Sequence, residues 1–163
     1  MRPIRIWRGL SKKEFFDRIR NGSLPTTSQV TPGQARELFE SIIKEGKDII
    51  HIGFSSGLSG SCGSEQIAAQ QLSEEYPDAR ITVIDSLCAC LGEGLLLYYV
   101  LKLQKEGKSY DEIVTWAEKN KLHVCHNVTV DDLNHLHRGG RISKATAILG
   151  TMVKIEADDP RGQ

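Results

Sequence analysis

An apolar run followed by a loop of serine and glycine most constrains what this chain can fold into. Residues 49–54 contain three isoleucines and a phenylalanine, residues 55–61 are serine or glycine except for Leu58, and a helical pattern then continues to about Tyr76. A strand, a loop and a helix start in this order leave unpaired amides beside hydroxyl groups, and such a place binds carboxylate or phosphate. The same residues also fit an ordinary strand-to-helix turn capped by serine.

The composition is that of a globular chain. It has 163 residues, 39% of them hydrophobic, and a formal net charge of zero. The length suffices for one domain with a real core, and the neutral balance gives no basic face for nucleic acid. No apolar run approaches the roughly 20 residues of a membrane span, and the first residues lack the apolar segment of a signal peptide. We therefore expect a cytoplasmic protein that does not span a membrane.

The cysteines do not predict a metal site. They are Cys62, Cys88, Cys90 and Cys125. None forms a C-x-x-C pair, and the spacing of Cys88 and Cys90 is poor for zinc. His123, Cys125 and His126 lie close together, but on a strand His126 would face away from the other two. We expect four reduced and mostly buried thiols, and no metal.

Capping residues mark several helix starts. Ser11 and Ser109 each stand three residues before a glutamate, which is capping-box spacing, and Thr31 precedes a proline. Predicted helices cover about 12–20, 32–46, 64–76, 95–105, 110–120 and 131–138, with a last one from Lys144. Predicted strands cover 49–54, 81–84 and 122–130. The expected buried side chains include Phe15, Phe16, Ile19, Leu38 and Ile67.

The alternation of strands and helices predicts an α/β fold, a mostly parallel sheet flanked by helices. In such sheets ligands bind at the carboxyl ends of the strands. The serine loop follows one strand, and Asp85 and Ser86 follow the next. Both polar segments are therefore expected at the same edge of the sheet. A second loop rich in hydroxyl groups, residues 24–30, precedes the helix that begins at Thr31.

Four motifs in this chain resemble those of the DegV family. They are Thr26-Thr27-Ser28-Gln29, the segment from Phe54 to Ser61, the pair Val83–Ser86 with Leu91–Gly94, and the segment from Leu136 to Ser143. They occur in the family's order and at about its spacing, and the resemblance covers about residues 14–155. Each motif alone is weak, but the four together are specific.

The resemblance implies a fatty-acid-binding protein without catalytic activity. DegV proteins are bacterial, and some present the carboxylate of a bound acyl chain to a separate fatty-acid kinase subunit. The family pattern places five residues near that carboxylate: Thr27, Ser28, Ser55, Ser56 and Arg141. The implied ligand is a long-chain fatty acid such as palmitate, stearate or oleate, with no cofactor and no metal.

Relative to the family, the chain looks shortened at both ends. Residues 1–130 resemble the first α/β domain without its usual first strand, and residues 131–163 resemble the start of the second domain. A missing strand would leave an open sheet edge, which invites pairing with a second copy. A homodimer is therefore an expected state.

Two alternatives remain open at the level of sequence. One is a shortened homologue that no longer binds lipid. The other is a small serine hydrolase, because Gly53, Ser55 and Gly57 have the G-x-S-x-G spacing of a nucleophile elbow. That short match is common by chance, and no histidine is placed by sequence to act as its base.

Overall fold

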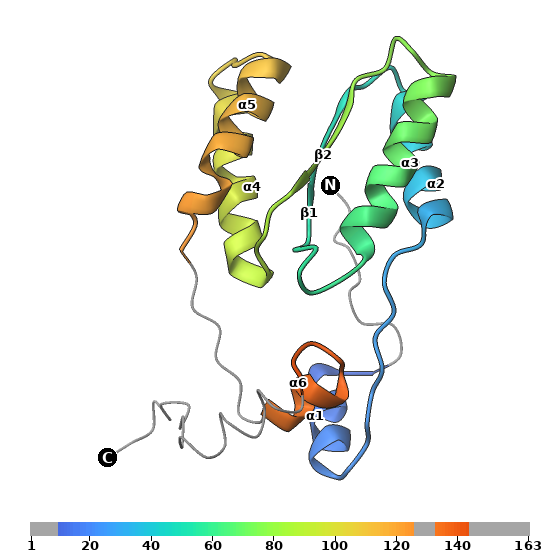
Figure 1. Cartoon of the computed structure of the whole chain (residues 1–163), viewed down its shortest axis with the longest axis vertical. Helices are drawn as coiled ribbons and strands as arrows, with labels where there is room; N and C mark the ends of the chain where they lie inside the picture. Colours follow the sequence, from blue (N-terminus) through green and yellow to red (C-terminus); the bar gives the residue numbers. More distant parts are fainter. Residues whose placement is uncertain (1–9, 126–132, 144–163) are drawn as a thin grey trace.

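Two parallel strands form the centre of the protein. The computed structural model describes residues 10–125 and 133–143. Strand β1 (Ile49–Gly53) pairs in parallel with β2 (Ile81–Asp85), with Ile49 opposite Ile81 and Gly53 opposite Asp85. Helix α3 (Ser61–Glu75) connects them (Figure 1). The α/β fold predicted from the sequence is confirmed, with two strands among the described residues.

Helices cover both faces of the sheet. Helix α2 (Pro32–Ile43) lies with α3 on one face, and α4 (Cys90–Lys105) lies with α5 (Tyr110–Asn120) on the other (Figure 1). The α2–α3 core contains Ala35, Phe39, Ile43, Ile49, Ala68, Ala69 and Leu72. The α4–α5 core contains Ile52, Ile84, Leu96, Val100, Ile113 and Ala117. The strands supply both cores because neighbouring residues of a strand point to opposite faces.

The predicted caps are present at the helix starts. Thr31 and Gln34 form a capping box on α2, as Ser109 and Glu112 do on α5. Helix α1 (Lys12–Arg20) has half of its box: the Ser11 hydroxyl accepts from the amide of Glu14, whose carboxylate instead pairs with Arg18. The local sequence therefore fixes these starts, because each cap satisfies amides that the helix leaves unpaired.

Two helices begin earlier than the sequence predicts. Helix α3 begins at Ser61 instead of about Ser64, because the Ser59 hydroxyl accepts from the amide of Ser61 at 3.2 Å. Helix α4 begins at Cys90 instead of about Leu95. Its two glycines lower helix propensity by only about 1 kcal/mol each, and packing of the helix against the sheet outweighs that cost.

The predicted strand over 122–130 is wrong at its start. Residues Lys121–His123 form a 3-10 turn, η1. Residues 126–130 lie outside the described part of the chain, as do the segment before residue 10 and the helix predicted from Lys144. A short helix, α6 (Leu133–Arg138), follows as predicted.

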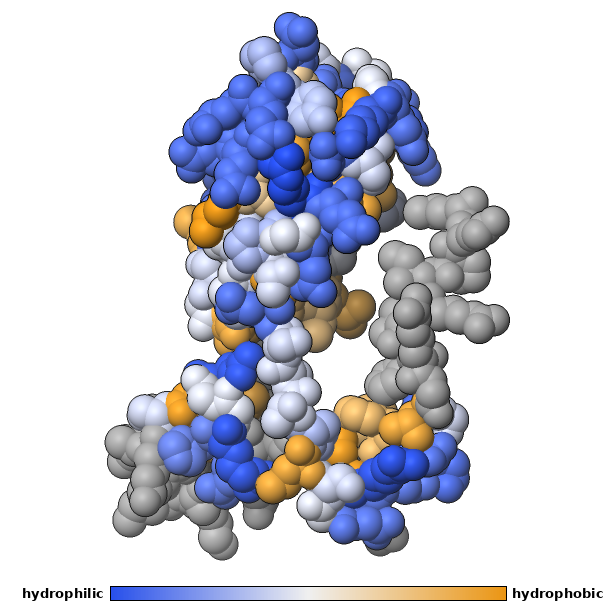
Figure 2. Space-filling view, turned by 90° about the vertical axis from the view of Figure 1, so that its right-hand side faces the viewer, coloured by the Kyte–Doolittle hydropathy of each residue, from blue (hydrophilic) through white to orange (hydrophobic). Residues whose placement is uncertain are grey.

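Three side chains expected to be buried are exposed. The exposed fractions are 48% for Phe16, 57% for Leu38 and 49% for Ile67, and α1 has no buried residue. Helices α1 and α6 both lie beyond the carboxyl ends of the strands (Figure 1). Figure 2 shows hydrophobic residues gathered in this lower part of the molecule. Helical spacing identifies an apolar face, but not whether another element covers it.

Only two of the four thiols are buried, although most of them were predicted to be. Cys62 and Cys88 are buried, whereas Cys90 and Cys125 are exposed, and all four are free. Burial, with the charges of Asp85 and Glu65, raises the pKa of Cys62 to about 11. Cys90 begins α4 and Cys125 follows η1, so both exposed thiols lie at the ends of elements.

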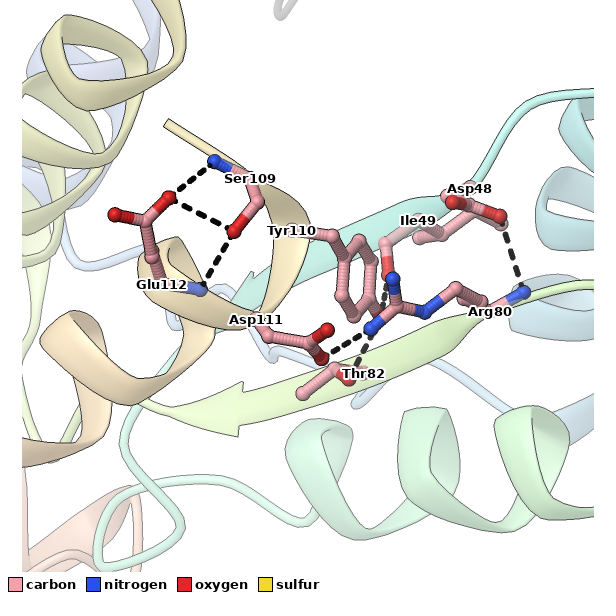
Figure 3. A network of polar contacts seen from close by, with 8 residues as sticks. All are labelled: Asp48, Ile49, Arg80, Thr82, Ser109, Tyr110, Asp111 and Glu112. Carbon is pink, nitrogen blue, oxygen red and sulfur yellow. Dashed lines mark hydrogen bonds and ion pairs between the residues drawn. The ribbon is translucent and has the colours of Figure 1, made fainter. Parts of the chain in front are cut away.

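A polar network joins α5 to the amino ends of the strands (Figure 3). The Tyr110 hydroxyl donates to the carbonyl of Ile49 at 3.0 Å and is hydrogen bonded to the Thr82 hydroxyl at 2.6 Å. The guanidinium of Arg80 lies 4.0 Å from the centre of the Tyr110 ring and pairs with Asp111. These contacts lie at the end of the sheet opposite the serine loop, so they stabilise the scaffold and leave the other end free for a site.

Candidate ligand-binding site

A cavity of about 820 Å³ lies beyond the carboxyl ends of the strands. Three segments far apart in sequence enclose it: the loop before α2, the serine loop before α3, and α6 with the loop that follows. Its lining residues are Leu24, Pro25, Thr26, Thr27, Ser28, Phe54, Leu58, Ser59, Ser61, Leu136, Arg138, Gly139 and Arg141. The volume lies within the roughly 300–1,000 Å³ that is usual for small-molecule sites.

The first wall is the extended loop from α1 to α2. Residues 21–30 are all exposed, and Thr26, Thr27 and Ser28 line the cavity. The loop is attached at its far end, where the amide of Val30 donates to the hydroxyl of Ser61 at 3.1 Å. Its three hydroxyl groups therefore face the start of α3 across the cavity.

The serine loop supplies the second wall. The hydroxyls of Ser59 and Ser61 lie 3.0 Å apart and both residues line the cavity. The backbone is tightly folded here, because the amides of Leu58 and Ser59 both donate to the carbonyl of Ser55. The positive end of the α3 dipole therefore lies beside two hydroxyl groups, which is an arrangement that favours an anion.

Ser55 and Ser56 lie behind this wall and are not among the lining residues. Ser55 is buried, and its hydroxyl accepts from the amide of Gly57 at 3.3 Å. The amide of Ser56 donates to the carboxylate of Asp85 at 3.2 Å. Both serines are thus occupied with contacts that hold the loop.

Asp85 joins the loops that follow the two strands. Partial burial raises its pKa, but hydrogen bonds from Ser56 and from the amide of Leu87 outweigh burial and hold the pKa below its ordinary range. The amide of Ser55 also donates to the carbonyl of Cys88 at 2.9 Å. The serine loop and Asp85 therefore share one edge of the sheet, as the sequence predicts.

The third wall is the end of α6. The amide of Gly140 donates to the carbonyl of His137, and the amide of Arg141 to that of Leu136. This is the Schellman pattern, and Gly140 takes the positive φ of 74° that it needs. The turn directs Arg141 across the cavity, where its guanidinium donates to the Thr27 hydroxyl at 3.4 Å and to the carbonyl of Gly139.

Of the five residues taken from the family pattern, three line the cavity: Thr27, Ser28 and Arg141. Four further polar lining residues were not in that set: Thr26, Ser59, Ser61 and Arg138. Ser59 and Ser61 belong to the serine loop that the sequence predicts as an anion site, but the helix that follows begins at Ser61 and not at about Ser64. Within residues 10–125 and 133–143, no group of three acidic, histidine or cysteine side chains has a geometry for a metal ion.

The rings of three described histidines contact groups other than serine hydroxyls. His51 Nε2 lies 3.1 Å from Glu65 Oε2, within ion-pair distance but not aligned for a hydrogen bond. The ring nitrogens Nδ1 of His123 and His137 lie 3.3 Å from the side chain of Asn120 and the carbonyl of Ile142, respectively. A hydrolase elbow would need a histidine base beside its serine. Within the described residues, no histidine is hydrogen bonded to Ser55.

The fold and the cavity together define an α/β domain with a candidate ligand-binding cavity. A sequence model described as "Uncharacterised protein, DegV family" matches residues 6–157. The chain belongs to the DegV family. No helix among the described residues is long and apolar enough to cross a bilayer.

Known relatives share both sequence and fold. A DegV domain-containing protein of Clostridium perfringens is 48% identical over 147 residues, which are 90% of this chain and 50% of that protein. A solved DegV family protein of Thermus thermophilus, described for its fatty acid binding, is 33% identical with a TM-score of 0.74, covering 91% of this chain and 51% of that one.

A third structure shows the same fold at lower identity. The fatty acid kinase B3 protein of Streptococcus pneumoniae, loaded with linoleic acid, is 24% identical with a TM-score of 0.70, covering 88% of this chain and 49% of that one. The chain thus spans about half the length of the relatives it matches.

Proposed function

We propose that this chain binds a long-chain fatty acid such as palmitate, stearate or oleate, and acts as a carrier that does no chemistry on it. The observation that carries the proposal is the mixed wall of the cavity. Hydroxyl groups and guanidinium groups line part of it, and apolar side chains line the rest. A ligand with a charged head and a long apolar tail fits such a wall, and it is the ligand named for the relative from Thermus thermophilus.

The carboxylate is assigned to the polar part of the wall. A desolvated carboxylate needs several donors, because an unpaired buried charge is costly. Thr27, Ser28 and Arg141 are the proposed direct donors, with Ser59 and Ser61 completing the shell from the start of α3. Charge-assisted hydrogen bonds from hydroxyls and a guanidinium are the strong kind.

Ser55 and Ser56 enter the proposal as residues that support the carboxylate site. The Ser55 hydroxyl and carbonyl fold the serine loop onto itself, and Ser56 attaches the loop to Asp85. Their removal would loosen the loop that carries Ser59. They act on the carboxylate through that loop.

The acyl chain is assigned to the apolar part of the wall. Leu24, Phe54, Leu58 and Leu136 contribute its aliphatic and aromatic surface. Each buried CH₂ group contributes about 0.8 kcal/mol, so a tail of about sixteen carbons binds well with few polar contacts. The tail thereby supplies most of the affinity, and the polar wall fixes which end of the ligand is held there.

A carrier that holds a carboxylate at a loop-lined cavity suits presentation to a separate enzyme. We propose a fatty-acid kinase subunit as that partner, which would transfer a phosphoryl group to the carboxylate. The similar fold of the Streptococcus pneumoniae fatty acid kinase B3 protein supports this assignment. On this proposal the chain itself needs no metal and no cofactor.

The test is native mass spectrometry of the purified chain, followed by lipid extraction. A mass increase equal to one fatty acid, or one that appears on adding palmitate, is the expected result. The same spectrum reports whether the chain is a monomer or a homodimer. If the chain has the mass of the protein alone, and adding palmitate or oleate does not change it, the chain has the family's fold but no lipid site.

A further inference from the structure

Helix α4 is apolar on its outer side as well as on the side that packs on the sheet. The inner side buries Gly92, Leu96 and Val100. Leu91 is 89% exposed and Tyr98 is 61% exposed. They belong to a set of six large apolar residues of α4 that stay exposed: Leu91, Leu95, Leu97, Tyr98, Tyr99 and Leu101. A helix that is apolar on both sides is normally covered on both sides.

These exposed residues form one surface, which we call the α4 outer face. Leu91, Leu95 and Tyr98 follow one another at intervals of four and three residues, so they make a stripe along the helix. Leu97 and Leu101, four residues apart, make a second row beside it. The face therefore extends over three turns of α4 and is not a set of scattered side chains.

The size of the α4 outer face is that of an interface. Since a fully exposed residue of this size presents about 200 Å², the six residues together expose on the order of 600 Å². The largest apolar patch of a typical monomer covers about 300–600 Å². Each partner in a standard protein interface buries about 800 Å². The face thus supplies most of what one side of a stable dimer needs.

The placement of charge favours a second copy in the opposite orientation. Glu93 is the one charged residue between Leu91 and Leu101, and it lies two residues from each of two stripe positions, so it turns away from the outer face. Lys102 and Lys105 follow in the last turn. Parallel pairing of two α4 helices would bring the lysines of both copies together. Antiparallel pairing separates them and opposes the two helix dipoles.

Gly94 allows two such helices to approach closely. It lies one turn before Tyr98 on the outer face, and a β-carbon added there would meet nothing within 4 Å. The distance between packed helices depends on the side chains at the contact, so a glycine brings the backbones nearer to each other. The open space at Gly94 also means that a larger residue fits within one copy.

We propose that the α4 outer face binds the same face of a second copy of this chain, with the two α4 helices antiparallel. The contact is self-complementary, as a twofold dimer requires. Its axis passes between Leu95 and Tyr98, so Tyr98 of one copy packs against Leu95 of the other. The cavity lining contains no α4 residue, so this interface goes beyond the proposed function and does not depend on fatty-acid binding.

Sedimentation equilibrium of the full chain, without added fatty acid, tests the proposal. The wild type should have twice its mass of 18.1 kDa at about 100 µM and dissociate towards about 1 µM, in the weak part of the range for interfaces of this size. Gly94→Arg should raise the dimer Kd about 100-fold, because like charges then meet in an apolar interface. Arginine has a higher helix propensity than glycine, so the variant should keep the wild-type circular dichroism spectrum.

Gly63→Arg is the matched control. Gly63 is also a helical glycine with nothing within 4 Å of an added β-carbon, but it lies on α3, which packs on the other face of the sheet. This variant should dimerise like the wild type. A wild type that stays monomeric, or a dimer that Gly94→Arg leaves intact, would overturn the proposal. The second result would instead assign the dimer to another surface, such as an open sheet edge.

Mixing two charge variants tests whether the two α4 faces meet. Gly94→Arg and Gly94→Glu should each be monomeric alone, and an equimolar mixture should dimerise, because opposite charges then face each other. A mixture that stays monomeric would overturn the antiparallel pairing. If the wild type is monomeric and sediments with phosphatidylglycerol vesicles, the face binds a lipid surface and the proposal is wrong.

Discussion

The guanidinium of Arg141 donates to the hydroxyl of Thr27 at 3.4 Å, joining two residues that lie 114 positions apart. Thr27 belongs to the loop that leads into α2, and Arg141 to the turn that ends α6. Their contact spans the cavity, so a ligand carboxylate between them would meet a cation and a hydroxyl together. The family pattern names both residues, but only the fold brings them into contact.

Arg141→Ala should weaken palmitate binding about 10- to 100-fold, because a hydrogen bond to a charged group contributes about 1.5–3 kcal/mol. Arg141→Lys should recover part of that loss, because lysine keeps the charge but not the planar fork. Isothermal titration with palmitate measures both. Lys119→Ala, which removes an exposed cation on α5, is the control and should bind normally. Equal affinity in Arg141→Ala and Lys119→Ala would remove Arg141 from the site.

Ser61→Ala should lower both stability and affinity. The Ser61 hydroxyl accepts from the amide of Val30 and lies beside that of Ser59, so its loss frees the first wall and removes a donor. We expect a cost of about 1 kcal/mol in unfolding free energy and a severalfold higher Kd. Urea denaturation and palmitate titration measure the two effects.

Ser56→Ala is the comparison for Ser61→Ala. The variant keeps the backbone amide that donates to Asp85 and removes only the Ser56 hydroxyl, whose hydrogen bond also lowers the pKa of Asp85, so that pKa should rise towards its ordinary value. The variant should change affinity less than Ser61→Ala, because it acts only through the loop. A larger loss of affinity in Ser56→Ala than in Ser61→Ala would contradict the supporting role assigned to Ser56.

Tyr110→Phe should destabilise the scaffold and spare the site. The phenol bonds to Ile49 and Thr82 at the amino ends of the strands, so losing it costs about 1–2 kcal/mol. The Kd for palmitate should stay the same, because the cavity lies at the opposite end of the sheet. Tyr98→Phe, on the exposed face of α4, should alter neither quantity. Denaturation and titration of both variants test this, and weaker palmitate binding in Tyr110→Phe would contradict it.

Glu112 should give α5 a pH-dependent stability. Hydrogen bonds from the amide and hydroxyl of Ser109, with the charge of Lys108, lower its pKa from 4.5 to about 2. Since the folded pKa lies below the unfolded one, its stabilisation is complete above about pH 4.5 and is lost as pH falls towards 2. The difference in Tm between wild type and Glu112→Gln should therefore shrink over that range.

The matched control for Glu112 is Glu37→Gln, which changes an exposed glutamate of α2 that lies outside any capping box. Its Tm difference from the wild type should not follow the same pH course. Thermal unfolding at a series of pH values decides this. A Tm difference for Glu112→Gln that is constant from pH 7 to pH 2 would show that the capping box does not titrate as described.

Thiol labelling should divide the cysteines into two pairs. Cys90 and Cys125 are exposed and should react with iodoacetamide at neutral pH. Cys62 and Cys88 should not, because both are buried and burial raises the pKa of each thiol. Mass spectrometry of the labelled native chain should show two additions, and the unfolded chain four. Rapid labelling of Cys62 in the native chain would contradict its burial.

The sequence alone determined where helices begin when the residues that cap them are close neighbours in the chain. Thr31 with Gln34 and Ser109 with Glu112 cap their helices through contacts only three residues apart, and both capping boxes are present. The alternation of strand and helix likewise determined the parallel pairing, because a helical crossover brings the next strand in parallel. Three of the four family motifs lie in the three segments that enclose the cavity, so the motifs indicated both the family and those segments.

Only the tertiary structure decided which side chains face the cavity and which stay exposed. Phe16 and Ile67 have the spacing of buried residues but remain exposed, since burial requires a second element that their own helix does not encode. Ser56 and Ser59 both lie in the serine loop, yet Ser56 contacts Asp85 and does not line the cavity. Ser59 contacts the start of α3 and does line it. Such choices depend on partners far along the chain, and local spacing holds no information about them.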